Sequence, residues 1–535
     1  MDRDNNQADT NGRAPMKRRQ FLISAAAGSV VTSTASAISS TRVEERSRSN
    51  DFDPAEASIA QLQRHLSSGL TSAALVTAYL RRISALDQQG PTYRSIIAIN
   101  PDALDIARTL DRERRANRLR GPLHGIPILI KDNIETSDRM PTTAGSLALA
   151  NAFHAKDAPL VARLRAAGAI ILGKTNLSEW ANFRSTFSSS GWSAVGGQTG
   201  NAYNSKRNPS GSSSGSAAAA ALSFAAAAIG TETDGSILSP SSVNGLVGFK
   251  PSIRAVSGQG IVPLSPRQDV AGPMARTVED ARLLANVIFD SPRRTPAGGV
   301  MPSGDWRVGV VPASSSMRAE VATLYAQAID VWRRVASSTI DTPLPASLRE
   351  AGQAEYTALL FEFKDSINAY LGALPPGLSE THTLESLIAF NRRLKDREMP
   401  FFGQEIFELA QAKGSLDDPE YLESLRQLRR LVEVDGLEKL FRELRVDVIV
   451  APGSGPSGLI DHVLGDRDDL GGSALGSAAA VAGYPSVTLP IGLARGMPVG
   501  MTVIARRFDD DRLLEIAALF EQTGKLRVPP SDQGV

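Results

Sequence analysis

The sequence predicts an α/β fold that forms one large domain. Apolar runs of strand length alternate with helical patterns, which is the arrangement expected when helices connect the strands of a sheet. Residues 160–167 follow helical spacing, Gly168 stops that pattern, and the apolar run 169–174 follows at once. No internal repeat or long low-complexity linker interrupts the chain after residue 52, so its 535 residues are expected to fold around one large core.

The same patterns give the order of the other elements. Residues 59–66 and 75–86 follow helical spacing, residues 95–99 form a short buried strand, and Pro101 begins another helix. The expected elements further along are strands at 306–311, 446–452 and 486–491, helices at 278–289, 321–335 and 511–523, a surface loop at 292–304, and a helix-rich segment at about 350–444.

Composition excludes several classes of function. The 58 Lys and Arg residues balance the 57 Asp and Glu residues, so no nucleic-acid-binding surface is predicted. The absence of cysteine excludes disulfides, thiolate metal sites and a cysteine nucleophile. The five histidines lack metal-ligand spacing, so we predict no metal, no other cofactor and no histidine base. His124, which lies just before a candidate lysine, is interpreted as structural.

Residues 1–37 are typical of a bacterial export signal. Lys17, Arg18 and Arg19 precede a short, weakly apolar run that ends in small residues at Ala37, where cleavage is expected. The paired arginines resemble a twin-arginine signal, which predicts an exported, periplasmic or secreted protein. The run is too short to span a membrane, so no stable membrane insertion is expected after cleavage. The alternatives are an ordinary basic signal peptide or a retained anchor.

Behind this signal we expect a charged, serine-rich tether at 38–51 and the main domain at 52–530.

The most informative stretch is 208–251, in which two serine-bearing loops flank an alanine-rich run. A Ser/Gly loop at 210–216 precedes residues 217–228, whose high helix propensity predicts a tightly packed helix. A second tight turn follows at 231–236, and its glycine allows close backbone approach. Folding the two loops together would bring one hydroxyl from each to the same point. The alternative interpretation is a flexible linker.

A lysine elsewhere favours an active site over a linker. Residues 123–134 read as a buried strand whose apolar run ends in Lys131. A lysine in that position must extend to solvent, pair with an acid such as Asp132, or lose its proton to desolvation. The third outcome would make Lys131 a general base for a neighbouring serine.

These three segments resemble the amidase signature family, whose members hydrolyse carboxamides with a Ser-Ser-Lys triad. The resemblance rests on the Lys131 strand, the loop 211–215 and the turn 235–237, in matching order and spacing. It implies a mixed β-sheet covered by helices. Segments 362–364, 387–391 and 402–405 lie outside the shared core and are similar to bacterial peptide amidases, in which such an insertion shapes the mouth of the substrate channel.

The resemblance also implies a role for each site residue. Ser236 would be the nucleophile, Ser212 the bridging serine on a cis peptide bond after Gly211, and Lys131 the base. The oxyanion would be met by backbone N–H groups of Ser236 and the residues before it, Thr233, Asp234 and Gly235. No substrate-binding side chain is assigned, although Trp180, Phe183 and Trp192 are expected either to flank the site or to pack in the core.

The function expected is hydrolysis of a carboxamide, foremost the C-terminal amide of a peptide, to the acid and ammonia. The partner would be a small-molecule or peptide amide, and the enzyme a monomer. Many family members have glycine and arginine where this chain has Asp234 and Leu238, which puts substrate preference in question. The alternatives are a broad aliphatic or aryl amidase, a glutaminase-type subunit of an amidotransferase, and a non-catalytic periplasmic binding protein.

Overall fold

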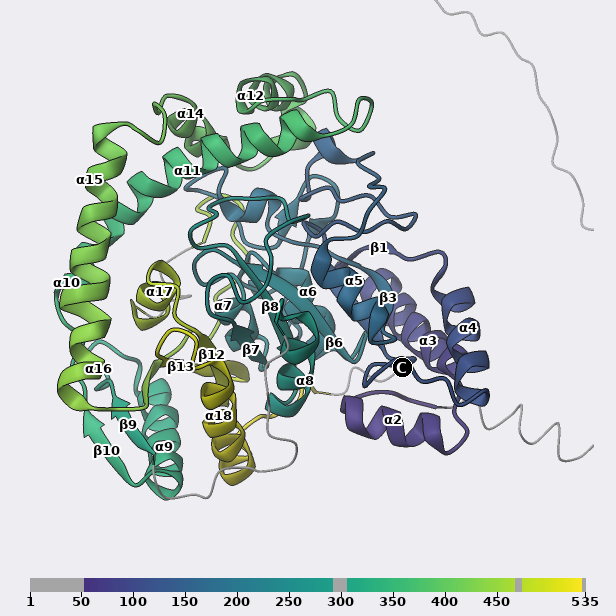
Figure 1. Cartoon of the computed structure of the whole chain (residues 1–535), viewed down its shortest axis with the longest axis horizontal. Helices are drawn as coiled ribbons and strands as arrows, with labels where there is room; N and C mark the ends of the chain where they lie inside the picture. The colour runs from purple at the N-terminus through teal and green to yellow at the C-terminus, as the bar shows by residue number, and fades with distance from the viewer. Residues whose placement is uncertain (1–51, 292–305, 467–473, 532–535) are drawn as a thin grey trace, which may run out of the picture. The chain divides into compact units, whose positions relative to one another are not determined.

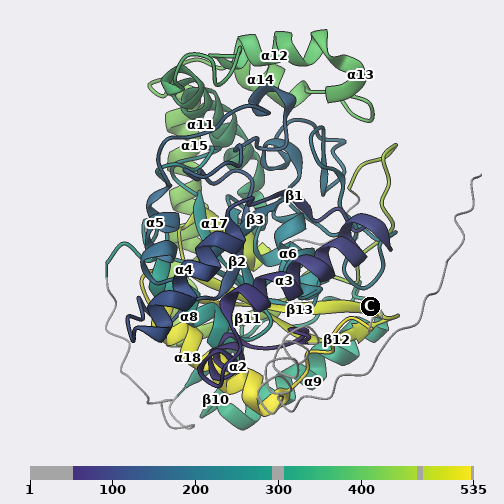
Figure 2. The same ribbon diagram turned by 90° about the vertical axis from the view of Figure 1, so that its right-hand side faces the viewer.

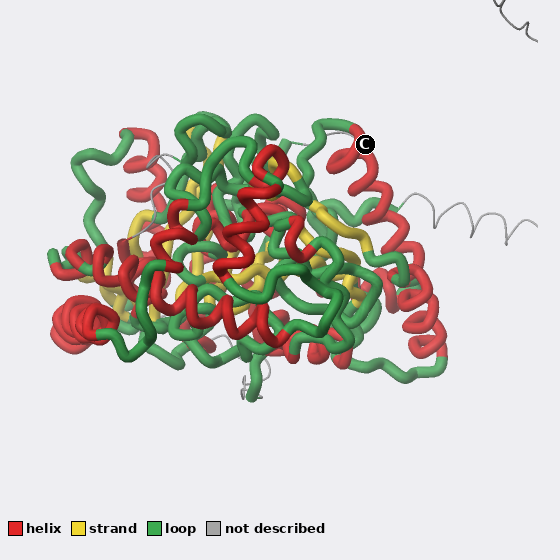
Figure 3. The backbone as a smooth tube through the Cα atoms, turned by 90° about the horizontal axis from the view of Figure 1, so that it is seen from above, coloured by secondary structure: helices red, strands yellow, loops and turns green. Residues whose placement is uncertain are grey.

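The computed structural model describes residues 52–291, 306–466 and 474–531. The predicted signal and tether, and most of the predicted loop at 292–304, lie outside the described residues. The described chain builds one α/β domain around a mixed sheet, as predicted, with helices covering the sheet (Figure 1). Seen from above, the strands run through the middle and the helices lie around them (Figure 3).

The main sheet has eleven described strands in the order β1-β3-β2-β6-β8-β7-β12-β13-β11-β9-β10. Within this order, β3, β2 and β6 pair parallel to one another, and so do β11, β9 and β10. Every pair from β6 through β8, β7, β12 and β13 to β11 is antiparallel. Their bounds are β1 Ile96–Ile99, β2 Pro127–Lys131, β3 Ile170–Thr175, β6 Ala227–Glu232, β7 Val247–Lys250, β8 Val270–Ala275, β9 Arg307–Val310, β10 Ser338–Asp341, β11 Val448–Pro452, β12 Ser486–Ala494 and β13 Met497–Ala505. A separate ribbon pairs β4 Trp192–Ser193 with β5 Gly197–Gln198.

Helices pack on this sheet where the sequence has apolar faces. The first, α2, begins with a capping box between Ser58 and Gln61 and buries Ile59, Leu62 and Leu66. The core helices are α2 Ile59–Ser67, α3 Ser72–Arg82, α4 Ala103–Arg115, α5 Pro159–Ala166, α6 Ser214–Ala221, α7 Leu238–Val243, α8 Val278–Ile288, α9 Ala319–Val335, α17 Ala474–Val481 and α18 Asp510–Gly524. No helix in the three described ranges is both long and apolar enough to cross a bilayer.

The chain between β10 and β11 is helical, as the pattern over 350–444 predicts. Figures 1 and 2 show its helices arching around one side and one end of the sheet domain. We call this segment the helical arch. It contains α10 Ser347–Glu350, α11 Gly352–Ala373, α12 Leu384–Arg393, α13 Lys395–Glu398, α14 Glu405–Gln411, α15 Pro419–Leu428, a π-helix at Arg429–Glu438 and α16 Lys439–Leu444.

Two predicted elements were wrong in extent. The helix expected over 217–228 ends at Ala221, and Ala227 already belongs to β6. Alanine fits either element, so pairing of β6 with β2 and β8 overrides its helix propensity. The strand expected over 123–134 covers only Pro127–Lys131, because the left-handed Gly125 turns the chain just before it.

Other strands were missed altogether. No strand was predicted over 497–505, yet β13 forms a hairpin with β12 there. Its Pro498 and Gly500 are typical of loops, and only the pairing with β12 and β11 makes the segment a strand. The strand expected at 486–491 therefore extends to Ala494.

A buried arginine connects the helical arch to the core. Arg184 and the two acids near it, Glu179 of the core and Glu398 of α13, have fully buried side chains. The guanidinium lies 2.8 Å from Glu179 and 3.8 Å from Glu398, and it stacks over the Phe402 ring. This contact fixes the start of α14 relative to the loop after β3.

We expect Arg184→Met to lower the free energy of unfolding by about 3 kcal/mol, because it leaves two buried carboxyl groups without their cation. Urea denaturation followed by circular dichroism measures the loss. The exposed Arg397, beside Glu398, is the matched control, and Arg397→Met should change stability by less than about 0.5 kcal/mol. Equal losses in the two variants would contradict a specific role for Arg184.

Candidate active site

The structure brings Lys131, Ser212 and Ser236 together. Lys131 is the last residue of β2, Ser212 lies in the loop before α6, and Ser236 lies in the turn after β6. The Lys131 Nζ atom is 2.8 Å from Ser212 Oγ, and Ser212 Oγ is 3.0 Å from Ser236 Oγ. Three segments that are far apart in the sequence thus form one hydrogen-bonded chain.

Lys131 is completely buried and surrounded by oxygen atoms. Its Nζ atom donates to the carbonyl oxygen of Thr231 at 3.3 Å and to Thr231 Oγ1 at 2.9 Å. Asn133 donates to the same hydroxyl at 3.0 Å. Burial lowers the pKa of Lys131 to about 7, although the nearby carboxylates of Asp269 and Glu232 act in the opposite direction. The amine can therefore be neutral near physiological pH.

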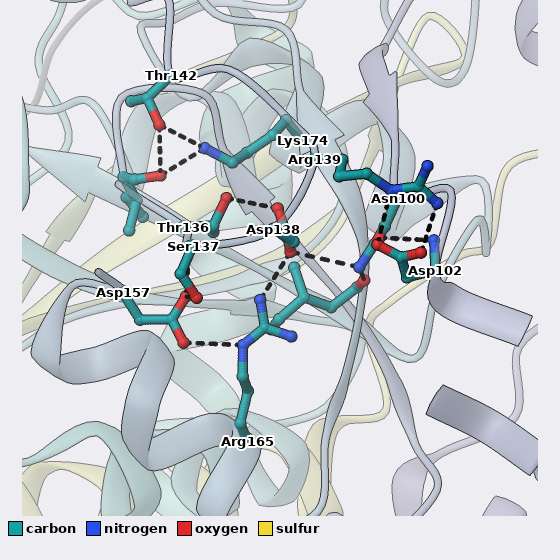
Figure 4. Close-up of polar contacts among 12 residues, drawn as sticks. Asn100, Asp102, Thr136, Ser137, Asp138, Arg139, Thr142, Asp157, Arg165 and Lys174 are labelled. Atoms are coloured by element: carbon teal, nitrogen blue, oxygen red, sulfur yellow. Dashed lines mark hydrogen bonds and ion pairs between the residues drawn. The ribbon is translucent and has the colours of Figure 1, made fainter. Parts of the chain in front are cut away.

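Lys131 does not pair with its sequence neighbour Asp132, which was one of the open alternatives. Asp132 instead accepts hydrogen bonds from Thr143 and lies 3.8 Å from Lys174 of β3. Lys174 in turn donates to Thr142 Oγ1, as Figure 4 shows, and also to the Ile134 carbonyl oxygen. A second buried lysine thus compensates Asp132 and leaves Lys131 to contact the serine.

The loop that follows β2 is also fixed by charged groups. Asp138 accepts hydrogen bonds from Thr136, Asn100 and Arg165, and Arg165 reaches Asp157 as well (Figure 4). These contacts anchor the backbone immediately after Lys131 to α5 and β1. His124, just before β2, bonds through its ring to the Leu110 carbonyl and the Arg120 N–H, so its role is structural.

The loop that bears Ser212 is tightly enclosed. The peptide bond between Gly211 and Ser212 is cis, as the resemblance implied. A Cβ atom at Gly211 would come within 2.2 Å of Ser178 Oγ, so only glycine fits there. The next residue, Ser213, donates from its N–H to the Ser236 carbonyl oxygen at 3.2 Å and from its hydroxyl to the Thr231 carbonyl oxygen at 3.0 Å. These bonds join the loop to the turn that bears Ser236.

The turn that bears Ser236 is held from behind by Glu232. One carboxylate oxygen of Glu232 accepts from the N–H groups of Ile237 at 2.7 Å and Leu238 at 2.9 Å. Gly235 adopts a left-handed φ of 77° that favours glycine. Among the described residues, no acceptor takes a hydrogen bond from the backbone N–H groups of the turn, which belong to Thr233, Asp234, Gly235 and Ser236. The turn therefore offers free donors beside the Ser236 hydroxyl.

A second layer connects the turn to α11. Thr233 Oγ1 donates to Asp269 at 2.6 Å, and burial raises the pKa of Asp269 to about 6. Gln268 donates both to the Thr233 carbonyl oxygen at 3.3 Å and to Glu355 of α11 at 2.8 Å. No sequence pattern pointed to a role for Glu232, Asp269, Gln268 or Glu355, because an isolated acid or amide forms no pattern in the sequence.

Two pockets flank the serines. One, of about 220 Å³, is lined by Gly211, Asp234 and Gly235, and the other, of about 310 Å³, by Thr231 and Thr233. We call them the outer-turn pocket and the inner pocket.

Between the two pockets runs a segment in which three consecutive residues, Trp180, Ala181 and Asn182, have φ of 50°, 56° and 68°. Ala181 faces the inner pocket and Asn182 the outer-turn pocket. Left-handed conformations are unfavourable for tryptophan and alanine, although asparagine adopts them more readily, and strained backbone of this kind is typical of functional sites. Trp180, Phe183 and Trp192 were expected either to flank the active site or to pack in the core. They are buried, and none of them lines either pocket, so they pack in the core.

Comparisons with known proteins agree with this geometry. The family model described as Amidase matches residues 74–514. A probable amidase of Arabidopsis thaliana is 39% identical over 485 residues, which cover 86% of this chain and 88% of that protein. A glutamyl-tRNA(Gln) amidotransferase subunit of Symbiobacterium thermophilum is 33% identical over 88% of this chain and 97% of its own length.

Solved structures extend the comparison to the fold. Native peptide amidase from Stenotrophomonas maltophilia is 43% identical, with a TM-score of 0.83 over 90% of this chain and 99% of that chain. A peptide amidase in complex with the competitive inhibitor chymostatin is 44% identical, with a TM-score of 0.84 over 90% of this chain and 100% of that chain. The protein therefore belongs to the amidase family and is an amide-hydrolysing enzyme.

Proposed function

We propose that the protein hydrolyses the C-terminal amide of peptides through an acyl-enzyme formed on Ser236. The observation that supports this most directly is the hydrogen-bonded chain from Lys131 through Ser212 to Ser236, next to a turn with free N–H groups. A serine needs a base and a site for the oxyanion to attack an amide, and this arrangement offers both.

In the proposed first step, neutral Lys131 accepts the hydroxyl proton of Ser212 while Ser212 accepts that of Ser236. The two amine hydrogens of Lys131 bond to the oxygen atoms of Thr231, which directs the nitrogen lone pair toward Ser212. Ser236 Oγ then forms a bond to the amide carbon. The carbonyl oxygen becomes an oxyanion, which the free N–H groups of residues 233–236 stabilise.

In the second step, the tetrahedral intermediate collapses and its C–N bond breaks. The proton held by Lys131 returns through Ser212 to the departing nitrogen, which leaves as ammonia. Water then attacks the ester carbon and loses a proton through Ser212 to Lys131. The bond from this carbon to Ser236 Oγ breaks, the proton returns through Ser212 to Ser236 Oγ, and the free acid departs. No net proton or electron is gained over the cycle.

This mechanism predicts that kcat/KM rises with pH through about 7, because only neutral Lys131 can accept a proton and burial lowers its pKa to that value. Below this range, kcat/KM should fall about tenfold per pH unit. Ammonia release from a peptide amide between pH 5 and 9, with the enzyme stable throughout, measures the profile. A profile that is flat across this range would contradict Lys131 as the base.

The pH profile of an Asp269→Asn variant tests the same assignment independently. The Asp269 carboxylate raises the pKa of Lys131, so neutralising it should move the rise in activity to lower pH. Asp269 accepts from the Thr233 hydroxyl with one oxygen and from the N–H groups of Leu264 and Ser265 with the other. Asparagine can keep its oxygen on the two N–H groups while its NH2 group donates to the Thr233 hydroxyl oxygen, which limits disturbance of the turn. A shift to higher pH would contradict the assignment.

Two further observations favour a peptide amide as the substrate over glutamine or a simple aliphatic or aryl amide. The similarity to peptide amidase, at 43–44% identity, covers about nine tenths of the chain. The arch contributes Glu355 to the layer behind the active-site turn. The amidotransferase subunits are less similar, at 32–33% identity. A broad aliphatic or aryl amidase remains the second candidate, because the family model matches any amidase.

Mass spectrometry of an amidated peptide incubated with the full-length protein tests the proposal. We expect conversion of the terminal amide to the acid with every internal peptide bond intact. A simple aliphatic amide and free glutamine are the comparison substrates. Turnover of the simple amide alone would favour a broad amidase, and preferential turnover of glutamine would favour the amidotransferase-type activity. An intact peptide amide would contradict the proposed substrate class. Light scattering of the same preparation tests the proposed monomer.

We also propose that residues 1–37 direct export through the twin-arginine route. The proposal rests on the basic start, the short apolar run and the small residues before Ala37. Expression in a bacterium followed by fractionation should place the enzyme in the periplasm. Replacement of Arg18 and Arg19 by lysine should retain it in the cytoplasm with unchanged activity, because those residues are far in sequence from the active site. Unaltered export of the double variant would contradict the twin-arginine route.

A further inference from the structure

A cavity lies between the helical arch and the core. It has a volume of about 530 Å³ and is open to solvent. Its outer wall comes from α11, α15 and the π-helix that follows, and its inner wall from loops around residues 253–254, 266–267 and 481–483. Figure 1 shows α15 standing beside the sheet domain across from these elements. We call this cavity the arch groove.

The arch groove leads to the active site. Ile253, Arg254 and Pro266 line both this groove and the inner pocket. The inner pocket is also lined by Thr231 and Thr233, and Thr231 contacts Lys131 through two of its oxygen atoms. A molecule with one end at the serines could therefore extend through the inner pocket into the groove.

The groove carries cationic side chains that have no partner. Among the described residues, the side chains of Arg254 and Arg429 make no hydrogen bond or ion pair, although both residues line the groove and are exposed. The other two arginines of its lining are engaged: Arg267 bonds to Glu362 at 2.8 Å, and Arg507 bonds to the Ala482 carbonyl oxygen.

One acid of the lining, Asp365, is also without a partner among the described residues. The free charges are therefore two positive and one negative, and Arg254 stands where the groove meets the inner pocket.

Glu433 of the lining lies 3.7 Å from Arg507, and apolar side chains make up much of the remainder. Leu425 and Leu428 of α15 and Phe508 of the core line the groove, and 61% of Phe508 is exposed to solvent. A groove that combines apolar walls with free guanidinium groups matches a peptide chain with apolar and acidic side chains. Guanidinium groups bind carboxylates through paired hydrogen bonds, which gives them geometric selectivity.

We propose that the arch groove binds the part of a peptide amide that precedes its amidated residue, and that Arg254 and Arg429 select an acidic side chain there. This proposal rests on the proposed function, because it places the reacting amide at Ser236. It goes beyond that function by naming the preferred class of peptide and the residues that recognise it.

The test uses short peptide amides that differ at a single upstream position, which holds glutamate, glutamine or lysine in turn. The varied position is moved along the peptide from one series to the next. In one series, the full-length enzyme should show kcat/KM about fivefold higher for the glutamate peptide than for the lysine peptide. The preference should weaken as salt rises, since exposed charges are screened. Arg254→Gln and Arg429→Gln should each reduce this preference, measured as the ratio of kcat/KM for the glutamate peptide to kcat/KM for the glutamine peptide.

Asp365→Asn is the matched control, because it removes a charge of opposite sign from the same groove. It should keep or increase the preference for glutamate. Equal kcat/KM for all three side chains, or a preference that survives both arginine substitutions, would overturn the inference while leaving peptide amide hydrolysis established. If the enzyme hydrolysed simple amides but none of the peptide amides, both the proposed function and this inference would fail.

Discussion

Replacing Ser236 by alanine is expected to lower kcat for amide hydrolysis by a factor of about 10⁵, because the variant has no oxygen to form the acyl-enzyme. The structure gives the physical reason: Ser236 Oγ is the end of the hydrogen-bonded chain from Lys131 and lies beside the free N–H groups of its own turn. Ammonia release and mass spectrometry of the peptide product measure the loss. Intact-mass analysis should also detect an acyl adduct with the wild type and none with the variant.

Two variants separate this loss from a folding defect. Ser241 lies in α7, five residues further along, and its buried hydroxyl has no hydrogen-bond partner among the described residues. Ser241→Ala should therefore keep both stability and kcat. Ser212→Ala should fold normally and lose most activity, since it interrupts the proton path. If Ser236→Ala stayed folded and retained wild-type activity, the nucleophile would have to be another residue.

The part of the site that the sequence could predict is the part with strong local signals. A Ser/Gly loop, an Asp-Gly-Ser turn and an apolar run that ends in lysine are visible within short windows, and the structure brings all three together. Glu232 and Asp269 support the turn without any such signal. Their roles depend on the folding of β6 and β8 beside each other, which no local window records.

The fold shows the same limit. Helices such as α2 and α9 follow from amphipathic spacing, because that spacing is itself the cause of their burial. The alanine run 217–228 holds both the end of α6 and the start of β6, and its composition alone suits a helix throughout. Neighbouring strands decide its second half, so only the assembled sheet reveals the boundary.

An apolar strand that ends in a buried lysine does not by itself identify a catalytic base. Three strands contain a buried lysine at or near their end: Lys131 in β2, Lys174 in β3 and Lys250 in β7. Burial lowers the pKa of each of them. What distinguishes them is their contacts, since Lys174 compensates an acid and Lys250 bonds to two carbonyl oxygens, whereas Lys131 faces a serine. A desolvated lysine becomes a candidate base only when a group that can give up a proton, such as a serine hydroxyl, lies next to it.

That distinction gives the last prediction. Lys131→Met should lower kcat by a factor of about 10⁴, because methionine fills a similar volume but cannot accept the Ser212 proton. Lys131→Arg should be similarly inactive, since a guanidinium stays protonated at every accessible pH. Activity is measured as ammonia release from a peptide amide and normalised to the folded fraction.

Lys250→Met is the matched control, because Lys250 is equally buried and its pKa is lowered to about 8. Its amine donates only to the carbonyl oxygens of Pro251 and Tyr484, so its loss should lower stability by about 2 kcal/mol. The kcat of its folded fraction should remain near the wild-type value. Comparable losses of kcat in the Lys131 and Lys250 variants would show that removing any buried lysine disturbs the sheet, and would remove the argument for Lys131 as the base. A loss confined to Lys131 would tie the chemistry to its contact with Ser212, because burial and a lowered pKa are common to both residues.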